Sequence, residues 1–154
     1  NILIMVDKSK IFAIGSYNVG YELKEFIKSK LIELDYQISD YGTFSENSMD
    51  YPDTAHPLAK DINDGKFEQG IIMCGSGNGV SMTVNKYPHV RAALSWIPEI
   101  AALGKQHNNA NILALPARFI GKEIAWEIVK AYLNAEFEGG RHKRRVEKIK
   151  PKNL

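Results

Sequence analysis

The fold is decided by the stretch Gly70-Ile71-Ile72-Met73-Cys74-Gly75-Ser76-Gly77-Asn78-Gly79-Val80. An apolar run ends here at the only cysteine of the chain, and three alternating glycines follow at once. Helix-capable residues continue to Lys86, so the order is strand, tight loop and helix N-terminus. Such a loop can gather backbone N–H groups around an anion, and the start of a helix adds partial positive charge. The stretch therefore predicts an anion site with a thiol at its edge.

The glycine spacing, Gly75-x-Gly77-x-Gly79, matches neither the P-loop nor the dinucleotide-binding fingerprint. A plain tight turn would also explain it, but so many glycines directly after a buried strand favour close approach of the backbone to a ligand. Cys74 by itself could be a small buried hydrophobe. Its place beside a helix N-terminus, which stabilises a thiolate, favours a nucleophile or a base.

The composition is that of one globular domain of 154 residues, with 44% hydrophobic and 25% charged residues. The net charge of +2 is too small to imply a nucleic-acid partner. A single cysteine excludes an intramolecular disulfide and a Cys-cluster zinc site, and it favours a reducing compartment, so we expect a cytoplasmic protein. The apolar start at residues 2–6 is too short for a signal segment or a membrane span. No metal or other cofactor is expected.

Strands alternate with helices along the chain, which predicts a single α/β domain: a doubly wound, Rossmann-like sheet of five parallel strands flanked by helices. Residues 1–9 are expected to form a short extension, and residues 139–154 a basic C-terminal helical arm behind a Gly139-Gly140 hinge. Pro57 is expected in a first helical turn, where proline is tolerated. The expected strands are 10–14, 37–41, 71–74, 90–94 and 111–115, and the expected helices are 19–34, 54–64, 80–86, 99–107, 122–133 and 141–149.

Polar clusters follow four of these strands, at residues 15–18, 74–79, 95–96 and 116–118. Ligands of such sheets bind at the carboxyl ends of the strands, so the clusters are expected to meet in one site. His107 stands at a helix end, where it is either a C-cap held by the helix dipole or a proton-transfer group. The basic tail is either a solvated helix or an arm whose arginines clamp a phosphate across a partner subunit.

Six stretches form a specific set: Gly20-Tyr21-Glu22-Leu23-Lys24, Asp50-Tyr51-Pro52-Asp53, Cys74-Gly75-Ser76-Gly77-Asn78-Gly79, Asn85-Lys86-x-Pro-x-Val-Arg91-Ala92-Ala93, His107-Asn108-Asn109-Ala110-Asn111 and Gly139-Gly140-Arg141-His142-x-x-Arg145. Across residues 10–149 the chain resembles the type B ribose-5-phosphate isomerases, which belong with the galactose-6-phosphate isomerase subunits. The resemblance implies a cofactor-independent aldose–ketose isomerase of the pentose phosphate pathway. Its expected reaction interconverts ribose 5-phosphate and ribulose 5-phosphate through a cis-enediolate.

The resemblance also implies residue roles. Cys74 becomes the base that moves the proton between C1 and C2. The backbone amides from Gly75 through Gly77 and Asn78 to Gly79 become the anion hole for the enediolate oxygen, with Ser76 assisting. His107 helps to open the furanose ring, with Asn108 beside it. The ligands of the substrate phosphate become Arg118, Arg141, His142 and Arg145. The implied site is shared between two subunits of a homodimer or tetramer.

The chain departs from the family pattern after its first strand. Where the family typically reads Ser-Asp-His-Ala-Gly, this chain reads Ser16-Tyr17-Asn18-Val19-Gly20. Tyr17 replaces a carboxylate and Asn18 replaces a histidine, so the family roles are not transferred to these two positions. Two alternatives stay open: an isomerase of another sugar phosphate, such as a hexose 6-phosphate, and a non-catalytic subunit that binds a sugar phosphate.

Overall fold

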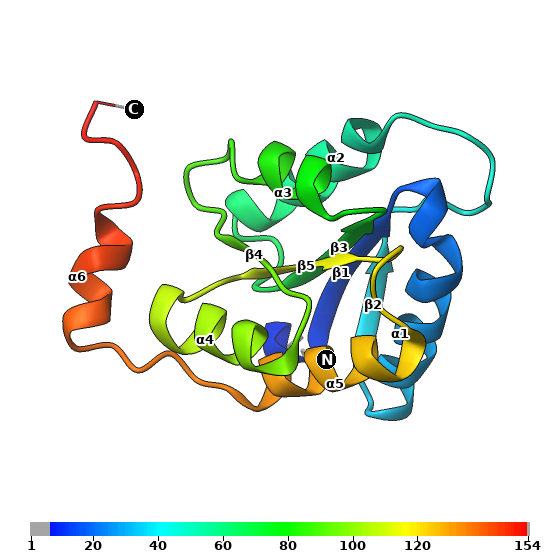
Figure 1. Cartoon of the computed structure of the whole chain (residues 1–154). Helices are drawn as coiled ribbons and strands as arrows, with labels where there is room; N and C mark the ends of the chain where they lie inside the picture. The colour runs from blue at the N-terminus through cyan, green and yellow to red at the C-terminus, as the bar shows by residue number, and fades with distance from the viewer. Residues whose placement is uncertain (1–6, 154) are drawn as a thin grey trace, which may run out of the picture.

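The structure is a computed structural model that describes residues 7–153. Its centre is a sheet of five parallel strands in the order β2-β1-β3-β5-β4 (Figure 1). The strand bounds are β1 Ile11–Ser16, β2 Gln37–Asp40, β3 Gly70–Cys74, β4 Ala92–Leu94 and β5 Ile112–Pro116. The predicted parallel α/β sheet is therefore confirmed. Of the expected extension, residues 1–6 lie outside the described part of the chain, and Lys8–Lys10 form a short 3-10 turn.

Helices cover both faces of the sheet (Figure 1). Helices α1 (Tyr21–Glu33), α4 (Pro98–Asn108) and α5 (Lys122–Asn134) pack on one face around Phe12, Met73 and neighbouring apolar side chains. Helices α2 (Tyr51–Asn63) and α3 (Asn78–Val84) pack on the other face. The three central strands are buried on both faces, as their near-continuous apolar runs predict.

Two helices begin earlier than the sequence predicted. Helix α2 starts at Tyr51, so the prediction that Pro57 stands in its first turn is wrong. Pro57 lies inside the helix but is exposed, so water can reach the carbonyl that has lost its partner. Helix α3 starts at Asn78, directly after Gly77. The glycine loop is therefore shorter than predicted, and Gly79 belongs to the first helical turn.

A buried ion cluster supports the segment after β2. The Lys24 side chain is fully buried, and its Nζ lies 2.7 Å from Asp40 Oδ2. Asp40 Oδ1 accepts a hydrogen bond from the Gly42 N–H at 2.9 Å, and the Gly42 carbonyl accepts one from the Ser16 N–H. Burial opposes ionisation of Asp40, but its hydrogen bonds from Lys24 and Gly42 outweigh this and hold its pKa below 3.8. The cluster thereby fixes the carboxyl end of β1.

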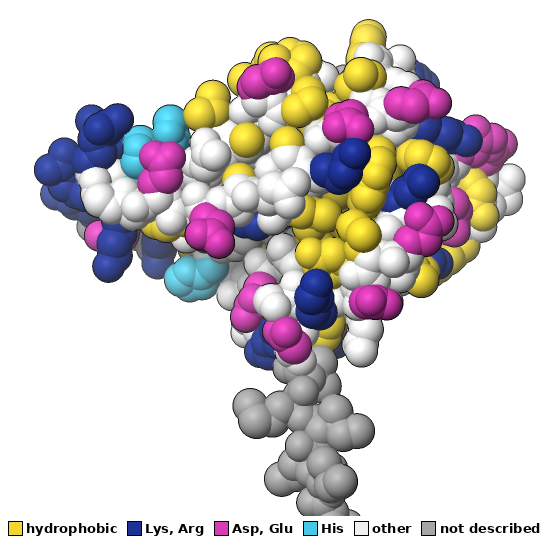
Figure 2. Space-filling view, turned by 90° about the horizontal axis from the view of Figure 1, so that it is seen from below, with side chains coloured by type: hydrophobic (Ala, Val, Ile, Leu, Met, Phe, Trp, Pro, Cys, Tyr) yellow, Lys and Arg dark blue, Asp and Glu magenta, His cyan; other side chains and the backbone are white. Residues whose placement is uncertain are grey.

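The C-terminal arm stands apart from the sheet (Figure 1). Its helix α6 (Arg141–Glu147) contacts α4 and has no buried residue. Figure 2 shows its Lys and Arg side chains gathered at one end of the molecule. A cleft of about 680 Å³ separates the arm from residues 85–91. None of the helices in residues 7–153 has the length and apolar character needed to span a membrane.

Candidate active site

Cys74 lies at the carboxyl end of β3 and is only 5% exposed. Its Sγ accepts a hydrogen bond from the Gly77 N–H at 3.2 Å. Gly77 has a φ of +78°, a left-handed conformation that glycine adopts readily, and this turn brings its N–H back to the thiol. A hydrogen bond of this kind stabilises the sulfur when it carries negative charge.

Some backbone N–H groups of the loop have an acceptor within the loop, and others have none. The Asn78 N–H donates to Ser76 Oγ at 3.2 Å, so it is used within the loop, as is the Gly77 N–H. Within residues 7–153, no acceptor pairs with the N–H groups of Ser76 and Gly79. Unpaired donors beside a thiol are suited to an oxygen that gains negative charge during a reaction.

Other side chains lie close to Gly75 and Gly79, within contact distance of where a Cβ would be at either position. A Cβ on Gly75 would lie 3.2 Å from Nε of Arg118. The backbone N–H of Arg118 also donates to the Gly75 carbonyl. A Cβ on Gly79 would lie 2.6 Å from the ring of Tyr51. The structure thus brings Arg118 to the Cys74 loop, as predicted. It also brings Tyr51 there, a residue that precedes the predicted helix 54–64 and was not among the predicted site residues.

Tyr17 lies beside Cys74. Strands β1 and β3 pair Ser16 with Met73, and the Tyr17 N–H donates to the Met73 carbonyl at 2.9 Å, so Tyr17 and Cys74 directly follow the last pair of the two strands. Both side chains belong to the apolar cluster beneath α2 and α3. The ring of Tyr17 meets the ring of Tyr51 edge to face, with centroids 6.2 Å apart.

The residues on either side of Tyr17 carry buried polar atoms without partners. Ser16 Oγ and Asn18 Oδ1 are both shielded from solvent, and neither has a hydrogen-bond partner within the described residues. Such atoms are costly to bury unless a ligand or a water molecule completes them. The carboxyl end of β1 is therefore suited to a ligand rich in hydroxyl groups.

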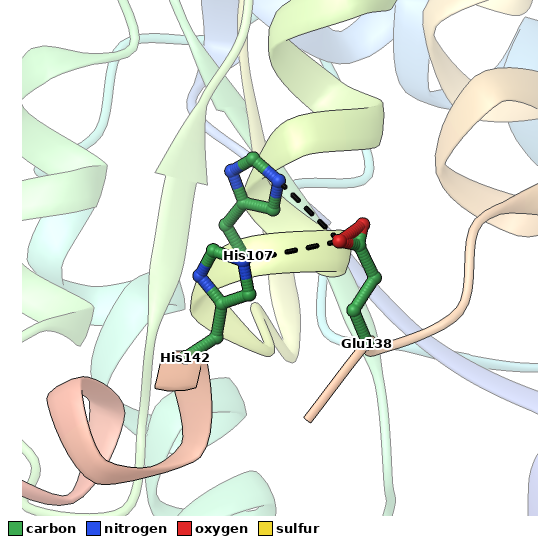
Figure 3. A group of neighbouring side chains, drawn as sticks. All are labelled: His107, Glu138 and His142. Carbon is green, nitrogen blue, oxygen red and sulfur yellow. Dashed lines mark ion pairs between the residues drawn. The ribbon is translucent and has the colours of Figure 1, made fainter. Parts of the chain in front are cut away.

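A second group of predicted residues lies where α4 meets the arm. His107 comes from α4, His142 from the first turn of α6, and Glu138 from the segment between α5 and α6 (Figure 3). The two imidazole rings are stacked, with centroids 4.2 Å apart and planes 7° apart. Glu138 Oε1 lies 3.7 Å from Nε2 of His107 and 3.8 Å from Nε2 of His142.

The environment of His142 disfavours its protonated form. Desolvation lowers its pKa below 6.5, and the nearby charges of His107 and Arg141 lower it further, while Glu138 acts in the opposite direction. The potential ligand atoms of the three residues lie within 4.8 Å of one another. However, imidazole binds a metal in the plane of its ring, and two parallel planes cannot both contain the same ion. As arranged, the two rings do not form a metal site.

The two groups are separated within one chain. Cys74 is level with Pro116 at the carboxyl edge of the sheet, whereas Ile112, the first residue of β5, is level with Gly70 at the amino edge. His107 precedes Ile112 by five positions and ends the helix that leads to this edge. The strand between the two edges spans on the order of 13 Å. One subunit therefore does not bring Cys74 and His107 together.

The predicted residues follow this division. On the Cys74 side are Arg118 and the loop from Gly75 to Gly79. On the His107 side are Asn108 and the arm residues Arg141, His142 and Arg145. Glu138 was not among the predicted residues, and the one sequence signal for it is its place directly before the Gly139-Gly140 hinge.

Comparison with known proteins identifies the family. The family described as ribose/galactose isomerase matches residues 12–149. The chain belongs to the ribose/galactose isomerase family. It is 41% identical over 140 residues to ribose-5-phosphate isomerase B of Escherichia coli, covering 91% of this chain and 94% of that protein. It is also 42% identical over 139 residues to D-erythrulose-4-phosphate isomerase of Pectobacterium atrosepticum, covering 89% and 91% of the two chains.

Solved structures of this isomerase family share the fold. A ribose 5-phosphate isomerase of Thermotoga maritima has a TM-score of 0.88 and 45% identity, with 90% of this chain and 96% of that chain covered. Ribose-5-phosphate isomerase B of Mycoplasma genitalium, solved with bound ribulose 5-phosphate, has a TM-score of 0.87 and 39% identity, with 90% and 93% covered. The resemblance read from the motifs is thereby confirmed.

Proposed function

We propose that the chain is an aldose–ketose isomerase that interconverts ribose 5-phosphate and ribulose 5-phosphate. The observation that carries this proposal is the thiol of Cys74 at a strand end, beside backbone N–H groups without protein acceptors. Removal of a proton next to a carbonyl needs a base and a place for the negative charge that develops on oxygen. The family and the ligand-bound relative support this substrate.

In this mechanism the Cys74 thiolate takes the proton from C2 of the open-chain aldose. The C2–H electrons form the C1–C2 double bond of a cis-enediolate, and the former carbonyl oxygen on C1 becomes negative. The N–H groups of Ser76 and Gly79 stabilise that oxygen. A proton then passes from the hydroxyl on C2 to the oxygen on C1, and Cys74 returns its proton to C1, which leaves the ketose. His107 helps to open the furanose ring before these steps. It gives a proton to the ring oxygen as the bond from C1 to that oxygen breaks, and the hydroxyl on C1 releases its proton to water as it becomes the carbonyl.

The separation of Cys74 from His107 supports a site that two subunits share. The arm of one subunit, with Arg141 and Arg145, would reach the Cys74 loop of the other and bind the phosphate bidentately. Helix α6 has no buried residue and Ile149 beyond it is 57% exposed, so the arm has apolar surface for a partner to cover. We therefore propose a homodimer, alone or within a tetramer. A cytoplasmic location fits a thiol that must stay reduced.

The test is isomerisation of ribose 5-phosphate by the purified protein. Wild type is expected to form ribulose 5-phosphate, and Cys74→Ala to lose roughly 10²–10⁴-fold in kcat/KM, as for the removal of a catalytic base. Cys74→Ala must keep the circular dichroism of wild type, so that the loss reports on chemistry. A fully active Cys74→Ala variant would exclude the mechanism, and an inactive wild type would exclude the function.

A second candidate is isomerisation of a sugar phosphate of another length. Tyr17 beside Cys74 favours this candidate, since it changes the wall of the site, and one relative is named for a four-carbon substrate. The non-catalytic subunit is the remaining alternative, and it predicts binding of sugar phosphates without turnover. A panel of four-, five- and six-carbon sugar phosphates, measured for both binding and turnover, separates all three functions.

A further inference from the structure

An aromatic wall stands beside the reactive thiol. It consists of Tyr17 and Tyr51, which we call the tyrosine pair. Tyr17 directly follows β1, as Cys74 follows the Met73 that pairs with Ser16, and it packs against the same apolar cluster as Cys74. Tyr51 covers the backbone of Gly79, since a methyl group there would lie 2.6 Å from its ring. The pair therefore lies between the apolar cluster of the thiol and the Gly79 end of the loop.

Backbone hydrogen bonds and a ring–ring contact hold the tyrosine pair in place. The Tyr17 N–H is held by the Met73 carbonyl, and the adjacent Ser16 N–H is held by the Gly42 carbonyl. The two rings meet at 90°, a favourable edge-to-face arrangement. Tyr51 is anchored at the start of α2, a helix whose inner face is fully packed. Neither ring can move aside without losing the edge-to-face contact, so the pair limits the width of the site.

From these contacts we propose that Tyr17, backed by Tyr51, determines specificity and restricts the enzyme to sugar phosphates of at most five carbons. This inference rests on the proposed isomerase function. The reacting carbons must lie at Cys74, while the phosphate is held by the arginines of the arm. With both ends fixed, a sixth carbon has to bulge sideways, and on this side of the site the rigid tyrosine pair blocks it. The ring of Tyr17 sets the limit, and its hydroxyl group is not required.

The experiment compares kcat/KM for D-erythrose 4-phosphate, D-ribose 5-phosphate and D-galactose 6-phosphate in wild type, Tyr17→Ala and Tyr17→Phe. Tyr17→Ala is expected to raise the ratio of six-carbon to five-carbon activity by about tenfold or more, the effect of opening a pocket by at least one carbon group. Tyr17→Phe is the matched control because it keeps the ring. Its ratio of six-carbon to five-carbon activity should stay within about twofold of the wild-type ratio.

Three outcomes overturn the inference. If wild type converts ribose 5-phosphate and Tyr17→Ala leaves the ratio unchanged, Tyr17 does not set the length limit, although the isomerase function stands. If Tyr17→Phe shifts the ratio as far as Tyr17→Ala does, the hydroxyl and not the ring is responsible. A wild type that converts none of the three sugars excludes the proposed function as well. Should Tyr17→Ala fail to fold, Tyr17→Leu, which keeps a shorter apolar side chain against Tyr51, gives the same comparison.

Discussion

Cys74 and His107 lie at opposite edges of the same parallel sheet, one at the end of β3 and the other before the start of β5. A strand length on the order of 13 Å separates these edges, which is too far for both residues to act on one sugar within a single subunit. The pair can meet only when two chains associate.

Subunit mixing tests this directly. Cys74→Ala and His107→Ala are each expected to be nearly inactive when purified alone. After the two are unfolded together and refolded, half of the dimers carry one variant of each kind, and each mixed dimer has one intact site. Activity should return to about a quarter of wild type. If the mixture stays as inactive as the separate variants, the two residues do not share a site across subunits.

Gly77→Ala is expected to lose both stability and activity. Gly77 has a φ of +78°, and a Cβ there would lie 2.4 Å from Leu94 Cδ1, so the substitution adds a clash to the backbone penalty. Gly65 is the matched control because it has the same φ of +78° and nothing within 4 Å. Gly65→Ala should cost about 1 kcal/mol and keep full activity. Urea unfolding and the isomerase assay measure both variants, and equal losses at the two positions would contradict the argument.

The pKa of His142 is expected to respond to its neighbours. Desolvation, His107 and Arg141 lower it below 6.5, and Glu138 raises it. Glu138→Gln should therefore lower the pKa further, and Arg141→Gln should raise it. NMR titration of the imidazole signals measures both shifts, with His56 as a distant control.

The same shift sets the pH dependence of this region. Because the pKa of His142 is lower in the folded state, the unfolded chain binds the proton more readily just below pH 6.5, so stability rises with pH through this window. The arm should dock least firmly at acidic pH. Hydrogen exchange in α6 that becomes slower as the pH falls, after correction for the intrinsic rate, would contradict this expectation.

Asp40→Asn tests the buried ion cluster. The substitution leaves the fully buried Lys24 with only the half-exposed Glu25 and should cost about 3–5 kcal/mol. Asp64→Asn breaks the exposed Lys60–Asp64 pair and should leave the free energy of unfolding nearly unchanged. Since the pKa of Asp40 is held below 3.8, its contribution is present above that pH and lost as the pH falls below it. Urea titrations at neutral and acidic pH measure these effects.

The sequence by itself determined the architecture and predicted most residues of the candidate site. Apolar runs that end in glycines or polar residues specify buried parallel strands, and the cysteine–glycine loop specifies where a backbone can approach a ligand. The helix starts were less well determined, because Asp50-Tyr51-Pro52-Asp53 and Asn78-Gly79 contain residues common in both loops and first helical turns.

Only the tertiary structure decided how the site residues are divided. Sequence patterns report which residues share an element, but they carry no information on which ends of different elements meet. The pairing of β1 with β3 brings Tyr17 against the apolar cluster that contains Cys74, and the packing of the arm against α4 stacks His142 on His107. Both relationships join residues distant in the chain, 57 and 35 positions apart, and arise from packing that no local pattern records.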